Sequence, residues 1–170
     1  MKIAIFNGSP RKENTYAMVQ AFREGAEAAG HEVEEYPVGR MKIAGCLACE
    51  YCHTKGEGSC IQKDDLEKIL PAYKDADMII FASPIYYFTM SAQIEAAIQR
   101  VYCLGAPQKA RKVALLLSSG SPGVYDSAVA QFNAYCAFAG MELAGVLTAN
   151  GEENKSDAKM AEIRDFAKAL

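Results

Sequence analysis

One stretch decides the fold, and it reads Ile3-Ala4-Ile5-Phe6-Asn7-Gly8-Ser9-Pro10-Arg11-Lys12-Glu13-Asn14-Thr15. An apolar run comes first, a turn rich in hydroxyl and amide groups follows, and a helical pattern begins directly after the turn. The sequence therefore predicts a buried strand, a turn and the N-terminus of a helix. The first-turn N–H groups have no partner within the helix, and the helix dipole is positive at this end, so a phosphate would be stabilised there.

The side chains of this turn suit the same ligand. Ser9, Asn14 and Thr15 can donate hydrogen bonds to phosphate oxygens. Arg11 or Lys12 can neutralise a dianion, and arginine offers the better fork. The turn contains neither Gly-x-Gly-x-x-Gly nor Gly-x4-Gly-Lys-Ser/Thr, which disfavours a dinucleotide or a nucleoside triphosphate and favours a monophosphate. The alternative is an ordinary helix start capped by serine or asparagine.

Length and composition limit the possible classes of protein. A chain of 170 residues, 51% of them hydrophobic, is expected to form one domain over residues 1–170. The net charge of -3 without a basic stripe argues against nucleic acid as a partner. No apolar stretch approaches membrane-spanning length, and the first apolar run is too short for a signal peptide, so we expect a cytoplasmic protein without a membrane partner.

Apolar runs alternate with helical patterns along the whole chain. The expected strands lie at residues 2–6, 31–36, 78–82, 112–117 and 143–147, and the expected helices at residues 15–29, 64–74, 91–104, 125–139 and 156–170. Strict alternation predicts an α/β fold, a doubly wound five-stranded parallel sheet of order 2-1-3-4-5 with helices on both faces. Such a sheet binds its ligand beyond the carboxyl ends of the strands, at the switch point between the first and third strands.

Two more loops of ligand-binding type follow strands that meet at this edge. Residues 83–87 follow the third strand, and residues 118–123 follow the fourth. A planar ring system needs a flat apolar wall and backbone donors, and Tyr86 or Tyr87 can supply the wall. The alternatives are that the tyrosines only close the end of the sheet and that residues 118–123 form a plain surface turn.

A cysteine cluster lies in the one long excursion, at residues 37–63. Its spacing is Cys46-x2-Cys49-x2-Cys52-x7-Cys60. In a reducing compartment such thiols are more often metal ligands or redox groups than a disulfide framework. Four thiolates this close can wrap one [4Fe–4S] cluster. Zinc is the competing metal, although two well-separated Cys-x2-Cys pairs are its usual signature, and cysteines without metal are a third possibility.

Three motifs resemble one known family. They are Gly8-Ser9-Pro10-Arg11-Lys12 with Asn14-Thr15, then Ala82-Ser83-Pro84-Ile85-Tyr86-Tyr87, and the cysteine cluster with its ending Cys60-Ile61-Gln62-Lys63-Asp64-Asp65. Together they are similar to the NADPH-dependent FMN reductase and iron–sulfur flavoprotein group of flavodoxin-fold proteins. The resemblance implies that the FMN phosphate is held by Ser9, Arg11, Asn14 and Thr15. It also implies that the flavin ring is bordered by Pro84, Ile85, Tyr86 and Tyr87 on one side and by Ser119 and Gly120 on the other.

The function expected from these observations is FMN-dependent electron transfer. No catalytic triad or carboxylate pair stands out, so the flavin would carry the chemistry. We expect an oxidoreductase that takes electrons from NAD(P)H or a reduced carrier and passes them to a small acceptor such as a quinone, a flavin or an iron–sulfur centre. The alternatives are an iron–sulfur flavoprotein that acts as an electron carrier with a redox protein, and a non-enzymatic zinc or redox-sensing module. The resemblance also implies a homodimer or homotetramer.

Overall fold

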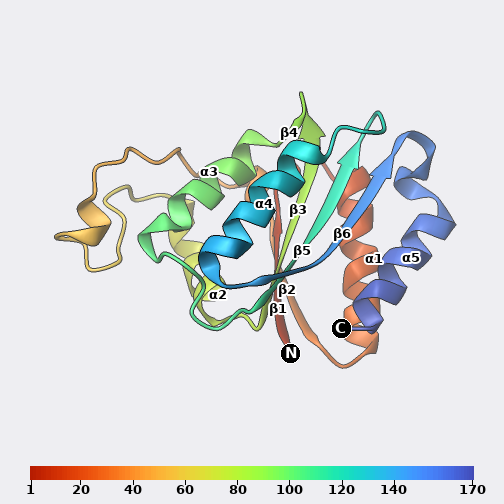
Figure 1. Cartoon of the computed structure of the whole chain (residues 1–170), viewed down its shortest axis with the longest axis horizontal. Helices are drawn as coiled ribbons and strands as arrows, with labels where there is room; N and C mark the ends of the chain where they lie inside the picture. The colour runs from red at the N-terminus through yellow and green to blue at the C-terminus, as the bar shows by residue number, and fades with distance from the viewer.

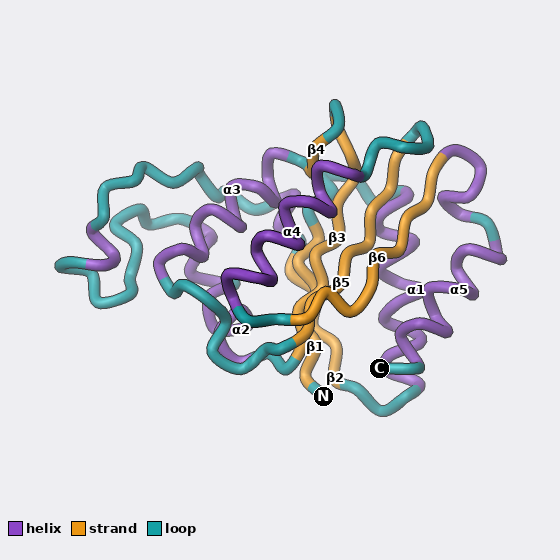
Figure 2. The backbone as a smooth tube through the Cα atoms, in the orientation of Figure 1, coloured by secondary structure: helices purple, strands orange, loops and turns teal.

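The computed structural model describes residues 1–170 and contains one parallel sheet between two layers of helices (Figure 1, Figure 2). The strand order is β2-β1-β3-β5-β6, and all four neighbouring pairs are parallel. This order confirms the one predicted from the sequence. The strands are β1 (Lys2–Asn7), β2 (Glu32–Tyr36), β3 (Met78–Tyr86), β5 (Lys112–Ser119) and β6 (Glu142–Asn150).

The helices cover both faces of the sheet. Helices α1 and α5 pack on one face, and α2, α3 and α4 lie on the other (Figure 1). No helix has the length and apolar character needed to cross a bilayer. The α-helices are α1 (Asn14–Ala28), α2 (Leu70–Asp75), α3 (Ala92–Arg100), α4 (Asp126–Ala139) and α5 (Asp157–Lys168). The 3-10 helices are η1 (Val38–Arg40), η2 (Tyr51–His53), η3 (Asp65–Lys68), η4 (Val101–Cys103) and η5 (Gly151–Lys155).

The sheet divides the hydrophobic core into two clusters. Successive side chains of a strand point to opposite faces, so Ile3 and Ile5 join the α1–α5 side while Ala4 and Phe6 join the other. A strand buried on both faces must be apolar at every position. This requirement explains the continuous apolar runs that identified the central strands.

The third strand is longer than expected. It was predicted to end at Ala82, but β3 continues to Tyr86 and turns back into the two-residue strand β4 (Thr89–Met90). Ile85 pairs with Met90 in antiparallel register. The predicted count of five strands therefore missed β4, because two residues are too short to show a periodic pattern.

The helix predicted over residues 64–74 is two shorter elements, η3 and α2. Pro71 lies in the first turn of α2 and has no N–H to donate to the carbonyl of Glu67, so a continuous helix cannot form. Asp64 caps η3, because its carboxylate accepts from the N–H of Leu66 at 3.1 Å. The helix predicted over residues 91–104 is also shorter than expected: α3 ends at Arg100, and the chain continues as the 3-10 helix η4.

Helices α1 and α5 approach closely at one glycine. A Cβ atom added at Gly25 would overlap the carbonyl oxygen of Arg164. This contact fixes α1, whose N-terminus carries the predicted phosphate turn, against the helix that follows β6.

We expect Gly25→Ala to lower the free energy of unfolding by about 1–3 kcal/mol, because backbone atoms must move apart to admit the methyl group. Helix propensity alone would change stability by about 1 kcal/mol in the opposite direction. Chemical denaturation would measure the difference. Glu27→Ala, on the exposed side of the same helix, is the matched control and should change stability little. A stabilised Gly25→Ala protein would contradict the close contact.

Candidate functional site

Three loops meet at the carboxyl ends of β1, β3 and β5 around a cavity of about 170 Å³. Its lining residues are Ser9, Arg11, Glu13, Asn14 and Thr15 after β1, Pro84, Ile85 and Tyr86 at the end of β3, and Ser118, Ser119 and Gly120 at the end of β5. The cavity therefore lies at the switch point of the sheet, where a doubly wound fold binds its ligand.

The backbone of the first loop is held from three sides. The N–H of Gly8 donates to the carbonyl of Ala82 at 2.7 Å. The hydroxyl of Ser91, at the start of α3, donates to the carbonyl of Gly8 at 2.7 Å. A Cβ atom at Gly39 would overlap the backbone of Ser9, so η1 packs directly behind the loop. These contacts fix the loop before any ligand arrives.

The N-terminus of α1 is open to an anion. Glu13 occupies the cap position, but its side chain makes no capping hydrogen bond, and the first turn contains no acidic residue. The Glu13 carboxylate instead binds the ammonium of Lys155 at 2.7 Å, and this hydrogen bond lowers the pKa of Glu13. Arg11 is exposed and belongs to no ion pair. Free N–H groups and a free guanidinium together fit a phosphate group.

The floor of the cavity is polar and closed. The hydroxyls of Thr15 and Ser118 are 2.7 Å apart, and both side chains are buried. This contact ties the start of α1 to the end of β5. Ser118 belongs to the predicted loop of residues 118–123, but only Ser119 and Gly120 were assigned a contact with the flavin.

Two side chains, one near in sequence and one distant, hold the β5 loop. The hydroxyl of Ser119 is 2.7 Å from that of Tyr125, which donates to the carbonyl of Ala149 at 2.9 Å. The side-chain amide of Asn154 donates to the carbonyl of Ser119 at 2.8 Å. Tyr125 and Asn154 were missed at the sequence level. The one signal for η5, which carries Asn154, is the capping box formed by Asn150 and Glu153.

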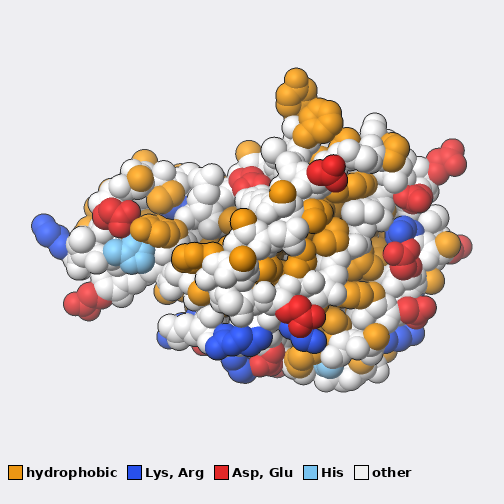
Figure 3. Space-filling view, in the orientation of Figure 1, with side chains coloured by type: hydrophobic (Ala, Val, Ile, Leu, Met, Phe, Trp, Pro, Cys, Tyr) orange, Lys and Arg blue, Asp and Glu red, His pale blue; other side chains and the backbone are white.

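The tip of the β3–β4 hairpin extends the site on its apolar side. A second cavity of about 180 Å³ shares Ile85, Ser119 and Gly120 with the first and adds Tyr87 and Phe88. Tyr87 is 96% exposed, and the hairpin stands out as an apolar protrusion at the top of Figure 3.

Two of the residues predicted for the site therefore lie outside the first cavity. Tyr87 lines the second cavity. Lys12 lines neither of them, because its ammonium lies over the ring of Tyr16, 5.8 Å from the centroid.

The cysteine loop extends away from the sheet, at the left of Figure 2. Cys46 and Cys49 are exposed, Cys52 and Cys60 are half-buried, and all four are free thiols. Burial raises the pKa of the Cys52 thiol. No three cysteine, histidine or acidic side chains are brought together as metal ligands. The donor chemistry of four free thiols fits a thiolate-ligated metal, but the loop does not assemble them here, so the metal site stays a prediction.

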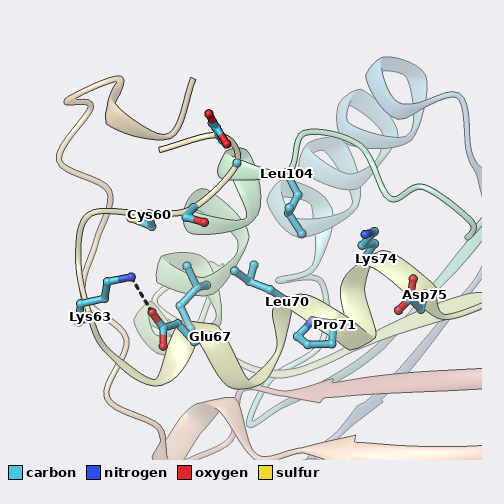
Figure 4. Close-up of a pocket in the computed structure, with 12 residues that line it drawn as sticks. Cys60, Lys63, Glu67, Leu70, Pro71, Lys74, Asp75 and Leu104 are labelled. Atoms are coloured by element: carbon cyan, nitrogen blue, oxygen red, sulfur yellow. Dashed lines mark hydrogen bonds and ion pairs between the residues drawn. The ribbon is translucent and has the colours of Figure 1, made fainter. Parts of the chain in front are cut away.

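A larger cavity of about 450 Å³ lies beside the last arm of this loop (Figure 4). Cys60 and Lys63 come from the loop, Leu70 and Pro71 from α2, and Leu104 from the segment after η4. The other two cysteines, Cys103 and Cys136, are buried among apolar residues of the core.

A family model and the curated relatives both relate this chain to flavin-dependent proteins. The chain matches the family model described as NADPH-dependent FMN reductase over residues 1–156. An iron–sulfur flavoprotein of Archaeoglobus fulgidus is 37% identical over 106 residues, which cover 62% of this chain and 47% of that protein. The chain spans about half the length of the curated relatives it matches.

Solved structures share the fold at low sequence identity. An azoreductase from Bacillus anthracis has a TM-score of 0.76 at 16% identity, with 100% of both chains covered. An NAD(P)H:quinone oxidoreductase from Methanothermobacter marburgensis has a TM-score of 0.72 at 19% identity, with 100% of this chain and 96% of that chain covered. The fold is therefore flavodoxin-like. With the family model matched over most of its length, this chain belongs to the NADPH-dependent FMN reductase family, a family of oxidoreductases.

Proposed function

We propose that this protein is an FMN-dependent oxidoreductase that takes electrons from NAD(P)H or a reduced carrier and passes them to a small acceptor such as a quinone or a flavin. The open N-terminus of α1, with Arg11 beside it at the switch point of the sheet, is the observation that carries this proposal. Family membership supports the cofactor and the electron donor. The structural neighbours named azoreductase and quinone oxidoreductase support a small acceptor.

The FMN phosphate would bind the first-turn N–H groups of α1 together with Ser9, Arg11, Asn14 and Thr15. The first cavity, at about 170 Å³, is smaller than the usual pocket for a whole drug-sized ligand, which holds roughly 300–1,000 Å³. The flavin ring would therefore extend past Ile85 into the adjoining cavity. There Tyr87 and the Ser119–Gly120 backbone supply an apolar wall and polar contacts.

Bound FMN supplies the hydride and electron chemistry, and the chain supplies binding and orientation. Glu13 is the one acidic residue of the first cavity, and its carboxylate is occupied by Lys155. The Thr15–Ser118 contact closes the floor, and the network through Tyr125 and Asn154 fixes the β5 loop. These preorganised residues would hold the flavin ring in one orientation and would limit the access of water to one of its faces.

A second candidate function is that of an electron carrier in which a cysteine-ligated [4Fe–4S] centre exchanges electrons with FMN. Its support is the set of four free thiols on one loop, together with the relatives named iron–sulfur flavoprotein. Cys46, Cys49, Cys52 and Cys60 would hold the centre. A zinc or redox-sensing module without enzymatic activity fits the open flavin-type site less well.

We further propose a homodimer or homotetramer as the working assembly. Large apolar side chains are exposed at the β3–β4 tip, with Tyr87 at 96% and Phe88 at 60%, and on α4, where Phe138 is 81% exposed. Exposed apolar groups of this size are typical of association surfaces.

Arg11→Ala should weaken FMN binding by about 1.5–3 kcal/mol, the scale of a charge-assisted hydrogen bond. Titration of the apoprotein with FMN, followed by flavin fluorescence, would measure it. Lys12→Ala is the matched control and should have a smaller effect, because Lys12 lies over Tyr16. Riboflavin lacks the phosphate. The wild type and Arg11→Ala should therefore both bind riboflavin weakly and with the same affinity. Equal affinities of the wild type for FMN and riboflavin would mean that the turn is only a helix start.

The proposed activity predicts that NADPH or NADH bleaches the visible absorption of the bound flavin under anaerobic conditions. A quinone added afterwards should restore the absorption. Free FMN at the same concentration is the control for uncatalysed reduction. Bleaching by dithionite but by neither nucleotide would rule out NAD(P)H as the donor and leave the reduced carrier.

A further inference from the structure

The cysteine loop leaves and rejoins the domain through a narrow neck, formed by residues 42–45 and 62–65. The N–H of Asp65 donates to the carbonyl of Lys42 at 3.1 Å, and the N–H of Lys42 donates to the Asp65 carboxylate at 2.8 Å. The side-chain amide of Gln62 donates to the carbonyl of Gly45 at 3.0 Å. Hydrogen bonds therefore join the two arms of the neck, residues 42–45 and residues 62–65, at both ends of the neck.

A single arginine occupies the centre of the neck. Arg100, the last residue of α3, is 1% exposed. Its Nη1 donates to the carbonyl of Ala44 and to the Asp64 carboxylate, both at 2.9 Å. Its Nη2 donates to the other oxygen of Asp64 at 3.3 Å and to the carbonyl of Gln62 at 3.4 Å. Asp64 in turn accepts from the N–H of Ala44 at 3.1 Å, so this ion pair binds both arms.

Burial of the Arg100 guanidinium costs free energy, because a charged group loses its contact with water. Burial alone would lower the pKa of Arg100, but hydrogen bonding and charge from Asp64, followed by smaller contributions from Cys60, raise that pKa above its usual value. Its Nε is buried without a partner. An apolar side chain could fill the same space without the desolvation of two ions. The presence of an arginine at this buried position is therefore explained by its hydrogen bonds to both arms of the neck.

The neck sets the positions of the outermost thiols. Cys46 directly follows Gly45, and Cys60 lies two residues before Gln62. Beyond the neck, Cys52 packs against the hydrophobic core, and the hydrogen bonds with the domain are exposed. The ring of His53 is 3.1 Å from the carbonyl of Tyr102, and the Tyr102 hydroxyl donates to the Glu50 carboxylate at 3.2 Å. The cavity beside Cys60 leaves further room (Figure 4). The distal part can rearrange while the neck keeps its form.

We propose that Arg100 is a positioning residue that, through Asp64, holds Cys46 and Cys60 in place so that the loop can close on a thiolate-ligated metal. This inference rests on the cysteine-ligated centre proposed above, and it concerns residues that are not ligands. The distal thiols of Cys49 and Cys52 would then join a frame whose two ends are already fixed, which lowers the conformational entropy lost on closure.

The test uses the FMN-loaded protein with reduced thiols under anaerobic conditions, titrated with Co²⁺ alone. The thiolate-to-cobalt charge-transfer absorption reports how many thiolates bind. We expect the wild type to take up one Co²⁺. Arg100→Gln and Asp64→Asn should each weaken uptake at least tenfold and reduce the absorption per bound cobalt, while FMN affinity stays unchanged. The double variant should lose no more than either single variant, because both residues act through one ion pair.

Two further variants keep the test decisive. Arg23→Gln removes an arginine that pairs with Glu35 on the other face of the sheet, and it should bind Co²⁺ like the wild type. Gln62→Ala removes one exposed neck hydrogen bond and should weaken Co²⁺ binding in the same direction even if the Arg100 variants fail to fold.

The possible failures differ from one another. If the wild type binds no Co²⁺, the loop does not close on a single metal ion and the role of Arg100 is wrong. The [4Fe–4S] centre holds four irons and inorganic sulfide, so iron and sulfide analysis of anaerobically prepared protein decides it separately. If the wild type, Arg100→Gln and Gln62→Ala bind Co²⁺ with equal affinity and absorption, the centre stands and the positioning role is wrong. A parallel loss of FMN and Co²⁺ binding in Arg100→Gln would show a general structural role and would also overturn the inference.

Discussion

The hydrogen bond from the N–H of Gly8 to the carbonyl of Ala82 is the interaction on which the flavin-type site depends. It continues the pairing of β1 with β3 by one residue beyond the end of β1, so the loops after these two strands start side by side. In a parallel sheet this happens only at the carboxyl edge, and only neighbouring strands can share it. The cavity is thus a direct consequence of strand order.

The two chemically marked regions of the chain are built in different ways. The phosphate loop is held mainly through its backbone, by Ala82, Ser91 and the close packing of Gly39. The cysteine loop is held by side chains, above all by the ion pair of Arg100 with Asp64. A loop held through its backbone takes its form when the sheet forms, whereas a loop fixed mainly at its neck can keep several conformations beyond the neck.

These differences explain what could be predicted from the sequence. The central strands and their order could be predicted, because burial on both faces demands continuous apolar runs. The turn between β1 and α1 could be predicted as well, because its residues are contiguous. Strand β4 could not, since two residues carry no period, and the break before Pro71 was hidden by a helical pattern on both sides. Asn154 was missed because its contact with Ser119 joins residues 35 positions apart. Tyr125 directly precedes α4, and nothing in its position shows that its hydroxyl lies against the hydroxyl of Ser119.

Helix α3 connects the two regions physically. Its cap, Ser91, binds the carbonyl of Gly8 in the phosphate loop, and its last residue, Arg100, binds the neck of the cysteine loop. A helix of 9 residues spans roughly 13 Å, at about 1.5 Å per residue, and does not stretch, so the separation of the loop from the neck is set by its length. Because each end is fixed by a buried hydrogen-bonding side chain, the distal cysteine loop can change its conformation without moving the flavin-type cavity. The proposed metal site at one end of α3 can therefore form without a change at the other end.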